Sequence, residues 1–213
     1  MSATAEQSAL KNAPAVLRAP LFESIITGLD PETRHVLLDL GPARAGTIEL
    51  LVGRRCRLDI LDLTDSLAEL DTMEDGDRMR AFAQKCLPDS KAEPVEVILC
   101  WNFLNYLRPT AIEAVLAPMI ERLAPGGVVH ALIEYATPTM PATPARMAPN
   151  ANHELVVEPT TGETIPSPRY RQKTLSAHLG GLTAERTMLL GNGMQEYLFR
   201  RSPEARPGAR PGA

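Results

Sequence analysis

Cysteine and histidine are scarce in this chain, and neither is arranged as in a metal site. The 213 residues include three cysteines and four histidines. The cysteines, Cys56, Cys86 and Cys100, lack the short, repeated spacing of zinc ligands. An odd number of cysteines does not suggest a disulfide framework either. We therefore expect no bound metal and a reducing compartment, the cytoplasm.

Long apolar runs and an excess of basic residues are also missing. No apolar stretch approaches the roughly 20 residues that cross a bilayer. The opening "MSATAEQSALKNAPAVL" has no basic segment followed by an apolar core, so we expect no signal peptide. The net charge is -4, which gives no electrostatic reason for binding nucleic acid or an anionic membrane. The sequence further lacks a Ser-His-Asp pattern and a P-loop.

What the sequence does contain is a regular alternation of strands and helices. Short, almost wholly apolar segments are typical of strands buried on both faces of a parallel sheet. We expect four of them, at residues 35–40, 56–63, 95–101 and 128–135. Helical spacing of apolar residues predicts helices at 19–29, 45–53, 64–73, 76–87 and 110–123. This order predicts a Rossmann-like, doubly wound α/β fold with a mostly parallel sheet and helices on both faces.

The last third of the chain has a different character. Residues 136–169 are rich in proline, and we interpret them as a lid or insertion. Within them, "ELVVE" and "ETI" flank a Thr-Thr-Gly and predict a small hairpin. A helix at 171–181 and an antiparallel strand pair around Gly191-Asn192-Gly193 follow. We expect one domain over residues 15–200, with a flexible N-terminus (1–14) and a disordered tail (201–213).

The candidate binding residues lie where the first two strands end. Asp39 and Gly41 end the first strand, and Asp62 ends the second, 21 residues after Gly41. That spacing is close to the one at which an acid accepts hydrogen bonds from a ribose. The loop "GPARAG" is a poor match for a pyrophosphate, which needs close backbone approach, so a nicotinamide-dependent oxidoreductase is the weakest alternative. A cofactor without phosphates makes a looser demand.

Several motifs occur together in an order that resembles the class I S-adenosylmethionine-dependent methyltransferases. They are "VLLDLGPARAG", the acid Asp62, "VEVILCWNFLNYL" and "LAPGGVVHALI", which cover roughly residues 33–135. The closing "GNGMQEYLFRR" is similar to the final antiparallel hairpin of that fold, and "LDLGP", "CWNFLNYL" and "NGMQEYLF" resemble a bacterial branch. The resemblance implies S-adenosylmethionine as cofactor and a small-molecule or protein methyl acceptor.

The resemblance also implies roles for individual residues. Asp39, Gly41 and the backbone of 42–46, including Pro42, Ala43 and Gly46, would hold the methionine part of the cofactor. Asp62 would hold the ribose, and Asn102 would lie near the transferable methyl group. Two departures concern the loop, where Ala43 replaces the usual second glycine and Pro42 removes an N–H donor. A third is that no strand with an adenine-binding residue is readable between 64 and 94; Asp89 is the nearest candidate.

Other polar and aromatic residues admit two interpretations each. Trp101 and Tyr106 fit core or loop packing, but a tryptophan at a pocket rim can also stack on adenine or a sulfonium. Glu134, Tyr135 and Tyr106 are candidate bases for a hydroxyl or amine acceptor. His130 fits a hydrogen-bonded core histidine. The leading hypothesis is a methyltransferase, and the alternative is a methyltransferase-fold protein that has lost catalysis and serves as a binding or scaffold module.

Overall fold

A six-stranded sheet forms the centre of the computed structural model, which describes residues 13–88 and 93–202. The strand order is β10-β11-β5-β4-β2-β3. Strands β2 to β5 pair in parallel, whereas β11 is antiparallel to both β5 and β10. The strands span β2 His35–Asp39, β3 Cys56–Ile60, β4 Val95–Leu99, β5 Leu123–Glu134, β10 Leu182–Leu189 and β11 Met194–Arg201.

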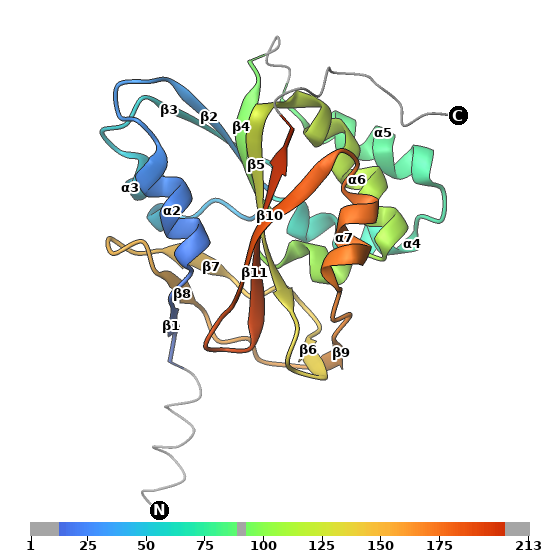
Figure 1. Ribbon diagram of the computed structural model, residues 1–213. Helices are drawn as coiled ribbons and strands as arrows, with labels where there is room; N and C mark the ends of the chain where they lie inside the picture. The colour runs from blue at the N-terminus through green and yellow to red at the C-terminus, as the bar shows by residue number, and fades with distance from the viewer. Residues whose placement is uncertain (1–12, 89–92, 203–213) are drawn as a thin grey trace, which may run out of the picture.

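Helices cover both faces of this sheet, so the predicted doubly wound α/β fold is confirmed. Figure 1 shows α2 (Pro20–Gly28) and α3 (Ala45–Leu51) on one side. On the other side lie α4 (Leu67–Thr72), α5 (Gly76–Cys86), α6 (Pro109–Arg122) and α7 (Gln172–His178). Two short 3-10 helices, Leu63–Ser66 and Phe103–Tyr106, follow β3 and β4. The apolar faces of the central strands are buried against both helical layers.

The region between β3 and β4 contains a 3-10 helix, α4 and α5 and no strand in its described part, residues 61–88 and 93–94. The two predicted helical pieces correspond to α4 and α5. Asp75 begins α5 because its carboxylate accepts hydrogen bonds from the backbone of Asp77 and Arg78. Asp89, the candidate adenine residue, lies outside the described residues.

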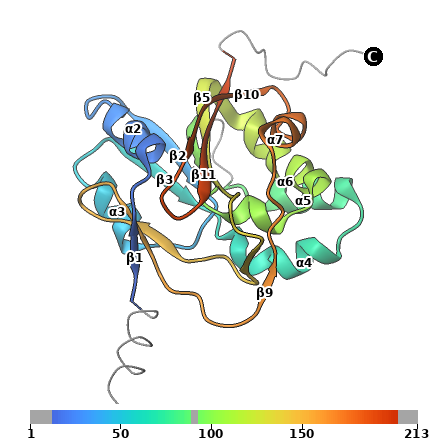
Figure 2. The ribbon, with the colours of Figure 1, turned by 60° about the horizontal axis from the view of Figure 1, so that its bottom comes forward.

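The prediction of a hairpin from "ELVVE" and "ETI" is wrong. Strand β8 (Leu155–Val157) lies between β1 (Ala15–Leu17) and β7 (Met147–Pro149), whereas β9 (Thr164–Pro166) pairs with β6 (Thr139–Pro141). Strand β8 instead forms a local hairpin with β7, whose turn is held by hydrogen bonds to the side chain of Asn150. Its pairing with β1 and the pairing of β9 with β6 join segments that are distant along the chain. Figures 1 and 2 show that these two small sheets lie beneath one edge of the main sheet.

Two further boundaries differ from those predicted. The Pro125-Gly126-Gly127 turn lies inside β5, where it forms a bulge that shifts the register between β4 and β5. Strand β11 continues to Arg201, one residue into the predicted tail. Of the ends that were predicted to be flexible or disordered, residues 13–14 and 202 are also described, next to β1 and β11. The other residues of these ends lie outside the described residues.

A buried carboxylate anchors α2 to the sheet. Glu196 of β11 is fully buried and accepts hydrogen bonds from the backbone N–H groups of Leu21 and Phe22, at 3.0 and 2.7 Å. It also lies 2.9 Å from Nε2 of His130 on β5. The first N–H groups of a helix have no partner within the helix, so this carboxylate satisfies two of them from outside. The interpretation of His130 as a hydrogen-bonded core histidine is confirmed.

Candidate functional site

The predicted cofactor residues come together at the carboxyl ends of β2 and β3. Asp39 is 1% exposed, and its Oδ1 accepts a hydrogen bond from the backbone N–H of Gly41 at 2.8 Å. Asp62 follows β3 in a left-handed backbone conformation, and its Oδ1 accepts a hydrogen bond from the hydroxyl of Thr64 at 2.7 Å. The two carboxylates are close enough that Asp62 contributes to the raised pKa of Asp39.

Asp39 is strongly affected by its surroundings. Burial raises the pKa of its carboxyl from 3.8 to about 6, although the hydrogen bonds from Trp101 and Gly41 act in the opposite direction. Perturbed carboxyls of this kind gather at functional sites, but structural contacts produce them as well. The groups that contact Asp39 therefore indicate whether its raised pKa has a functional or a structural origin.

The principal partner of Asp39 is the indole of Trp101. The indole Nε1 donates a hydrogen bond to Oδ1 of Asp39 at 2.5 Å, and Trp101 itself adopts a left-handed backbone (φ 48) directly after β4. A Cβ atom on Gly41 would lie 2.8 Å from Cδ1 of this indole. Glycine at position 41 is thus required by a side chain of the protein itself, in the place where the sequence suggested room for a cofactor.

The second glycine of the loop is explained in the same way. A Cβ atom on Gly46 would lie 2.2 Å from the carbonyl oxygen of Pro149 in β7. The start of α3 and β7 therefore approach each other closely only because residue 46 has no side chain. Both glycines of "GPARAG" allow close contact with other parts of the chain in this conformation.

Little space is left between these groups. The cavity beside Gly41, Thr64, Cys100 and Met147 has a volume of about 10 Å³. Ligand pockets usually enclose about 300–1,000 Å³. This cavity is thus too small for a ligand in this conformation. For a ligand to enter it, the side chains that line it, among them Trp101 and Met147, would have to move apart.

A larger cavity adjoins this place at the ends of β4 and β5. It has a volume of about 280 Å³, and Asn102 and Glu134 are among the residues that line it. The turn between β10 and β11 contributes Asn192 and Met194, and the three-stranded sheet β1-β8-β7 contributes Ala15, Met147 and Val157. Asn102 lines both cavities. The structure therefore brings the predicted cofactor and acceptor residues to one edge of the sheet.

Three of the predicted site residues, Tyr106, Tyr135 and Ala43, line neither of these two cavities. The hydroxyl of Tyr106 lies 3.0 Å from the carbonyl oxygens of both Pro141 and Thr143, so it holds the proline-rich segment. Burial raises the pKa of Tyr106, which makes it a poor base. Tyr135 is 41% exposed. Ala43 is exposed as well, whereas Pro42 lines the small cavity.

Several lining residues were not predicted from the sequence. Thr64 follows Asp62 by two residues, and this Asp-x-Thr pattern is a local signal that could have pointed to it. Asn192 was assigned only to a turn. Glu158 and Met194 reach the site through the pairing of β8 with β1 and of β11 with β5, which join segments distant along the chain. Met147 lies in β7, which forms a local hairpin with β8 that the sequence analysis missed.

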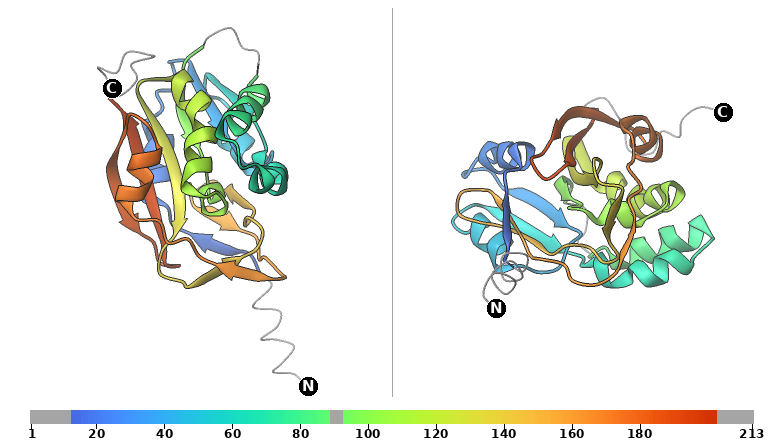
Figure 3. Two further views of the ribbon diagram at one scale, coloured as in Figure 1. Left: turned by 90° about the vertical axis from the view of Figure 1, so that its right-hand side faces the viewer. Right: turned by 90° about the horizontal axis from the view of Figure 1, so that it is seen from below.

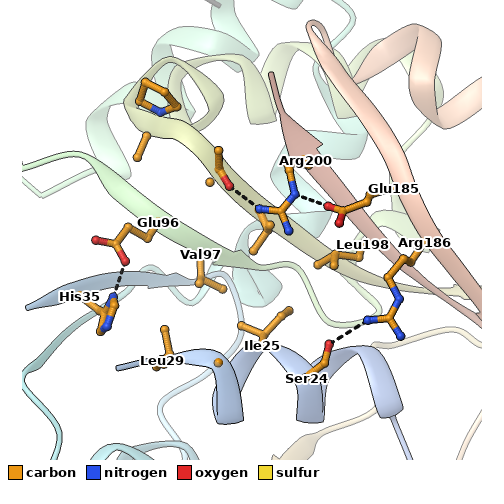
Figure 4. Close-up of a pocket in the computed structure, with 16 residues that line it drawn as sticks. Ser24, Ile25, Leu29, His35, Glu96, Val97, Glu185, Arg186, Leu198 and Arg200 are labelled. Atoms are coloured by element: carbon orange, nitrogen blue, oxygen red, sulfur yellow. Dashed lines mark hydrogen bonds and ion pairs between the residues drawn. The ribbon is translucent and has the colours of Figure 1, made fainter. Parts of the chain in front are cut away.

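Another groove lies at the opposite edge of the sheet. Figure 4 shows it between α2 and the strands, with a volume of about 500 Å³. Its charged side chains already have partners: His35 with Glu96, Arg200 with Glu185, and Arg186 with the hydroxyl of Ser24. It lies at the amino ends of the parallel strands, away from Asp39 and Asp62, and we assign it no chemistry.

The described residues offer neither a metal site nor a membrane-spanning helix. Residues 13–88 and 93–202 contain no group of three or more histidine, cysteine or acidic side chains placed to hold a metal ion. None of the helices in the same residues is both long and apolar enough to cross a membrane. Cys56, Cys86 and Cys100 are all free thiols.

Comparison with known proteins identifies similar folds. No protein-family model and no curated protein sequence matches the chain. Among solved structures, the 1,6-didemethyltoxoflavin N1-methyltransferase of Burkholderia thailandensis, with bound 1,6-didemethyltoxoflavin and S-adenosylhomocysteine, is 16% identical with a TM-score of 0.48; the match covers 86% of this chain and 77% of that one. The N-methyltransferase NodS of Bradyrhizobium japonicum WM9, in complex with S-adenosylhomocysteine, is 16% identical with a TM-score of 0.46, over 87% and 85%. The glycopeptide N-methyltransferase MtfA, also with S-adenosylhomocysteine, is 12% identical with a TM-score of 0.47, over 85% and 88%. This likeness concerns the fold alone.

Proposed function

We propose that the protein is an S-adenosylmethionine-dependent methyltransferase of the cytoplasm, from the bacterial branch that its motifs resemble. The observation that carries this proposal is the convergence of Asp39, Gly41 and Asp62 at the carboxyl ends of β2 and β3, next to the cavity lined by Asn102 and Glu134. Ligands of doubly wound sheets bind at this edge. Asp39 and the loop after it would hold the methionine part of the cofactor, and Asp62 the ribose.

S-adenosylmethionine, when bound, supplies an electrophilic methyl group whose leaving thioether needs no acid. The chain then has to position the acceptor and exclude water. Glu134 is the best placed of the three candidate bases, because it lines the acceptor cavity and burial raises its pKa. Binding requires that Trp101 and β7 first vacate the cofactor place.

A specific observation favours a second candidate function, that of a non-catalytic binding or scaffold protein. Trp101 donates a hydrogen bond to Oδ1 of Asp39, and the carbonyl oxygen of Pro149 lies 2.2 Å from where a Cβ of residue 46 would be. A site that has lost its ligand can be filled by side chains in this manner. The two candidates differ in a single measurable property, which is the affinity for the cofactor.

Isothermal titration calorimetry of the full chain with S-adenosylmethionine, S-adenosylhomocysteine and NAD separates them. A methyltransferase should bind the first two, with affinity in about the micromolar range, and not NAD. Asp62→Asn should weaken this binding about tenfold or more, since it removes a charged acceptor, while asparagine tolerates the left-handed backbone at position 62. Asp65→Asn, which changes an exposed acid nearby, is the matched control. No binding at millimolar ligand would favour the scaffold function.

A further inference from the structure

The cavity of about 280 Å³ has an uneven chemical lining. Its apolar lining residues include Met147, Val157 and Met194. Its polar side chains are carboxylates, carboxamides and a hydroxyl, and no lysine, arginine or histidine is among its lining residues. Figures 1 and 3 show that the small sheet of β1, β7 and β8 lies near the lower end of β5. The cavity is small and suits a compact ligand.

Asn102 is the most unusual residue of this lining. It is 5% exposed, and its backbone oxygen accepts a hydrogen bond from Asn105. No other described residue is found to hydrogen-bond its carboxamide, which lines the cavity. Its carboxamide atoms are not among the fully buried polar atoms that lack a partner, and Asn102 lines the cavity, so the carboxamide is open to it. A ligand in the cavity would hydrogen-bond with this carboxamide in place of water.

Glu134 is incompletely satisfied too. Its Oε2 accepts a hydrogen bond from the hydroxyl of Thr137 at 3.0 Å, and no described lysine, arginine or histidine forms an ion pair with it. Glu158, the second carboxylate of the lining, is paired with Arg44 at 3.3 Å and is 47% exposed at its side chain. Glu134 therefore contributes most of the uncompensated negative charge, and it does so where the cavity meets the end of β5.

We propose that this cavity binds a small organic ammonium ion, with its N–H groups directed to Glu134 and to the carboxamide oxygen of Asn102. Its apolar body would pack against Met147, Val157 and Met194. Charge-assisted hydrogen bonds to a carboxylate are stronger than neutral ones, so a cation is selected over a neutral molecule of equal shape. A carboxylate ligand would meet Glu134, with which no described cationic side chain forms an ion pair, and would be rejected.

Binding of the ammonium ion goes beyond the proposed function and does not depend on methyl transfer. If the protein is a methyltransferase, an amine of this kind is the class of acceptor that the cavity selects. Only this assignment of the acceptor rests on the proposed function. The two are tested separately, because the ammonium is titrated in the absence of S-adenosylmethionine.

Methionine methyl groups report on the cavity directly. The full chain is labelled with 13C at the methionine methyls and titrated at about pH 7.5 with benzylammonium chloride, benzyl alcohol and sodium benzoate. The signals of Met147 and Met194, assigned through Met147→Leu and Met194→Leu, should shift saturably with benzylammonium. Benzyl alcohol should bind about tenfold or more weakly, and benzoate should cause no shift. Equal shifts from all three compounds, or none from benzylammonium at about 10 mM, would overturn the proposal.

Three variants localise the binding. Glu134→Gln should weaken benzylammonium binding about tenfold or more. Glu158→Gln changes a half-exposed side chain without touching the core, and should cause a smaller loss because Arg44 already pairs with it. Glu163→Gln changes an exposed acid of the same proline-rich segment and should cause none. If Glu163→Gln weakens binding as much as Glu134→Gln does, binding reflects general surface charge and the proposal is wrong. Failure of cofactor binding leaves these outcomes unaffected.

Discussion

At the scale of a single residue, Asp39 shows how one side chain serves the fold. Its Oδ1 accepts both hydrogen bonds, from Gly41 and from Trp101. Because burial raises the pKa of its carboxyl from 3.8 to about 6, the folded protein holds the Asp39 proton more tightly than the unfolded chain does. Protonation of Asp39 therefore favours folding. This contribution is complete below about pH 4 and is lost as the pH rises through about 6.

Asp39→Asn should remove this pH dependence. Asparagine keeps an oxygen that can accept both hydrogen bonds but cannot ionise. We expect the variant to be more stable than the native protein at pH 7.5, by about 1–3 kcal/mol, and the difference to vanish near pH 4. Urea unfolding followed by circular dichroism between about pH 4 and 8 measures this. The exposed Asp65→Asn should leave the profile unchanged. A parallel loss of stability at every pH would mean that the carboxylate form is needed.

At the scale of the elements, the contact between α3 and β7 positions the proline-rich segment. Gly46→Ala places a Cβ only 2.2 Å from the carbonyl oxygen of Pro149, so β7 has to move. We expect a stability loss of about 1–3 kcal/mol and faster proteolysis within residues 139–166. Limited proteolysis with mass spectrometry locates the cuts. Gly28→Ala is the control, since nothing lies within 4 Å of its added Cβ. Unchanged proteolysis of Gly46→Ala would show that the contact does not hold the segment.

The elements also show which parts of the fold the sequence could predict. The strands of the central sheet are short apolar segments with flanking turn residues, and their patterns are local, so β2, β3, β4 and the β10–β11 hairpin were predictable. The segment 136–169 was not, because its strands each have three residues, and β1 with β8 and β6 with β9 pair over long distances along the chain. Only β7 and β8 form a local hairpin. Its prolines end three of these strands, at Pro141, Pro149 and Pro166, and give no sign of the pairing.

The candidate site, like the fold, was predictable from the sequence only in part. Asp39, Gly41 and Asp62 follow strands whose ends meet at one edge of a parallel sheet, so their proximity follows from topology. The role of Trp101 did not follow, because it depends on a left-handed backbone at the end of β4 and on the rotamer that aims its indole at Asp39. Sequence position places Trp101 near the site but does not distinguish a stacking platform from a side chain that fills the site.

At the scale of the whole molecule, the proposed cofactor binding would be coupled to a rearrangement. The cavity beside Gly41 has a volume of about 10 Å³, so a cofactor that enters it would bind only to molecules in which Trp101 and β7 have moved. The apparent affinity then falls in proportion to the fraction of molecules in the open state. Minor states of this kind are populated at about 0.1–10%. Removing the indole should therefore raise the affinity that calorimetry measures.

Trp101 is the only tryptophan of the chain, and so its fluorescence reports this rearrangement without a label. Saturating S-adenosylhomocysteine should move the emission of Trp101 to longer wavelength, because the indole leaves a site where it is now 5% exposed. Trp101→Ala should bind the cofactor about tenfold or more tightly than the native chain, since no closed state competes. Trp101→Phe, which keeps most of the bulk and loses the hydrogen bond to Asp39, should lie between the two. If cofactor binds to the native chain with unchanged emission, and Trp101→Ala binds no better, the cofactor lies elsewhere and Trp101 is only part of the core. If neither protein binds cofactor, the filled site is permanent and the scaffold function takes precedence.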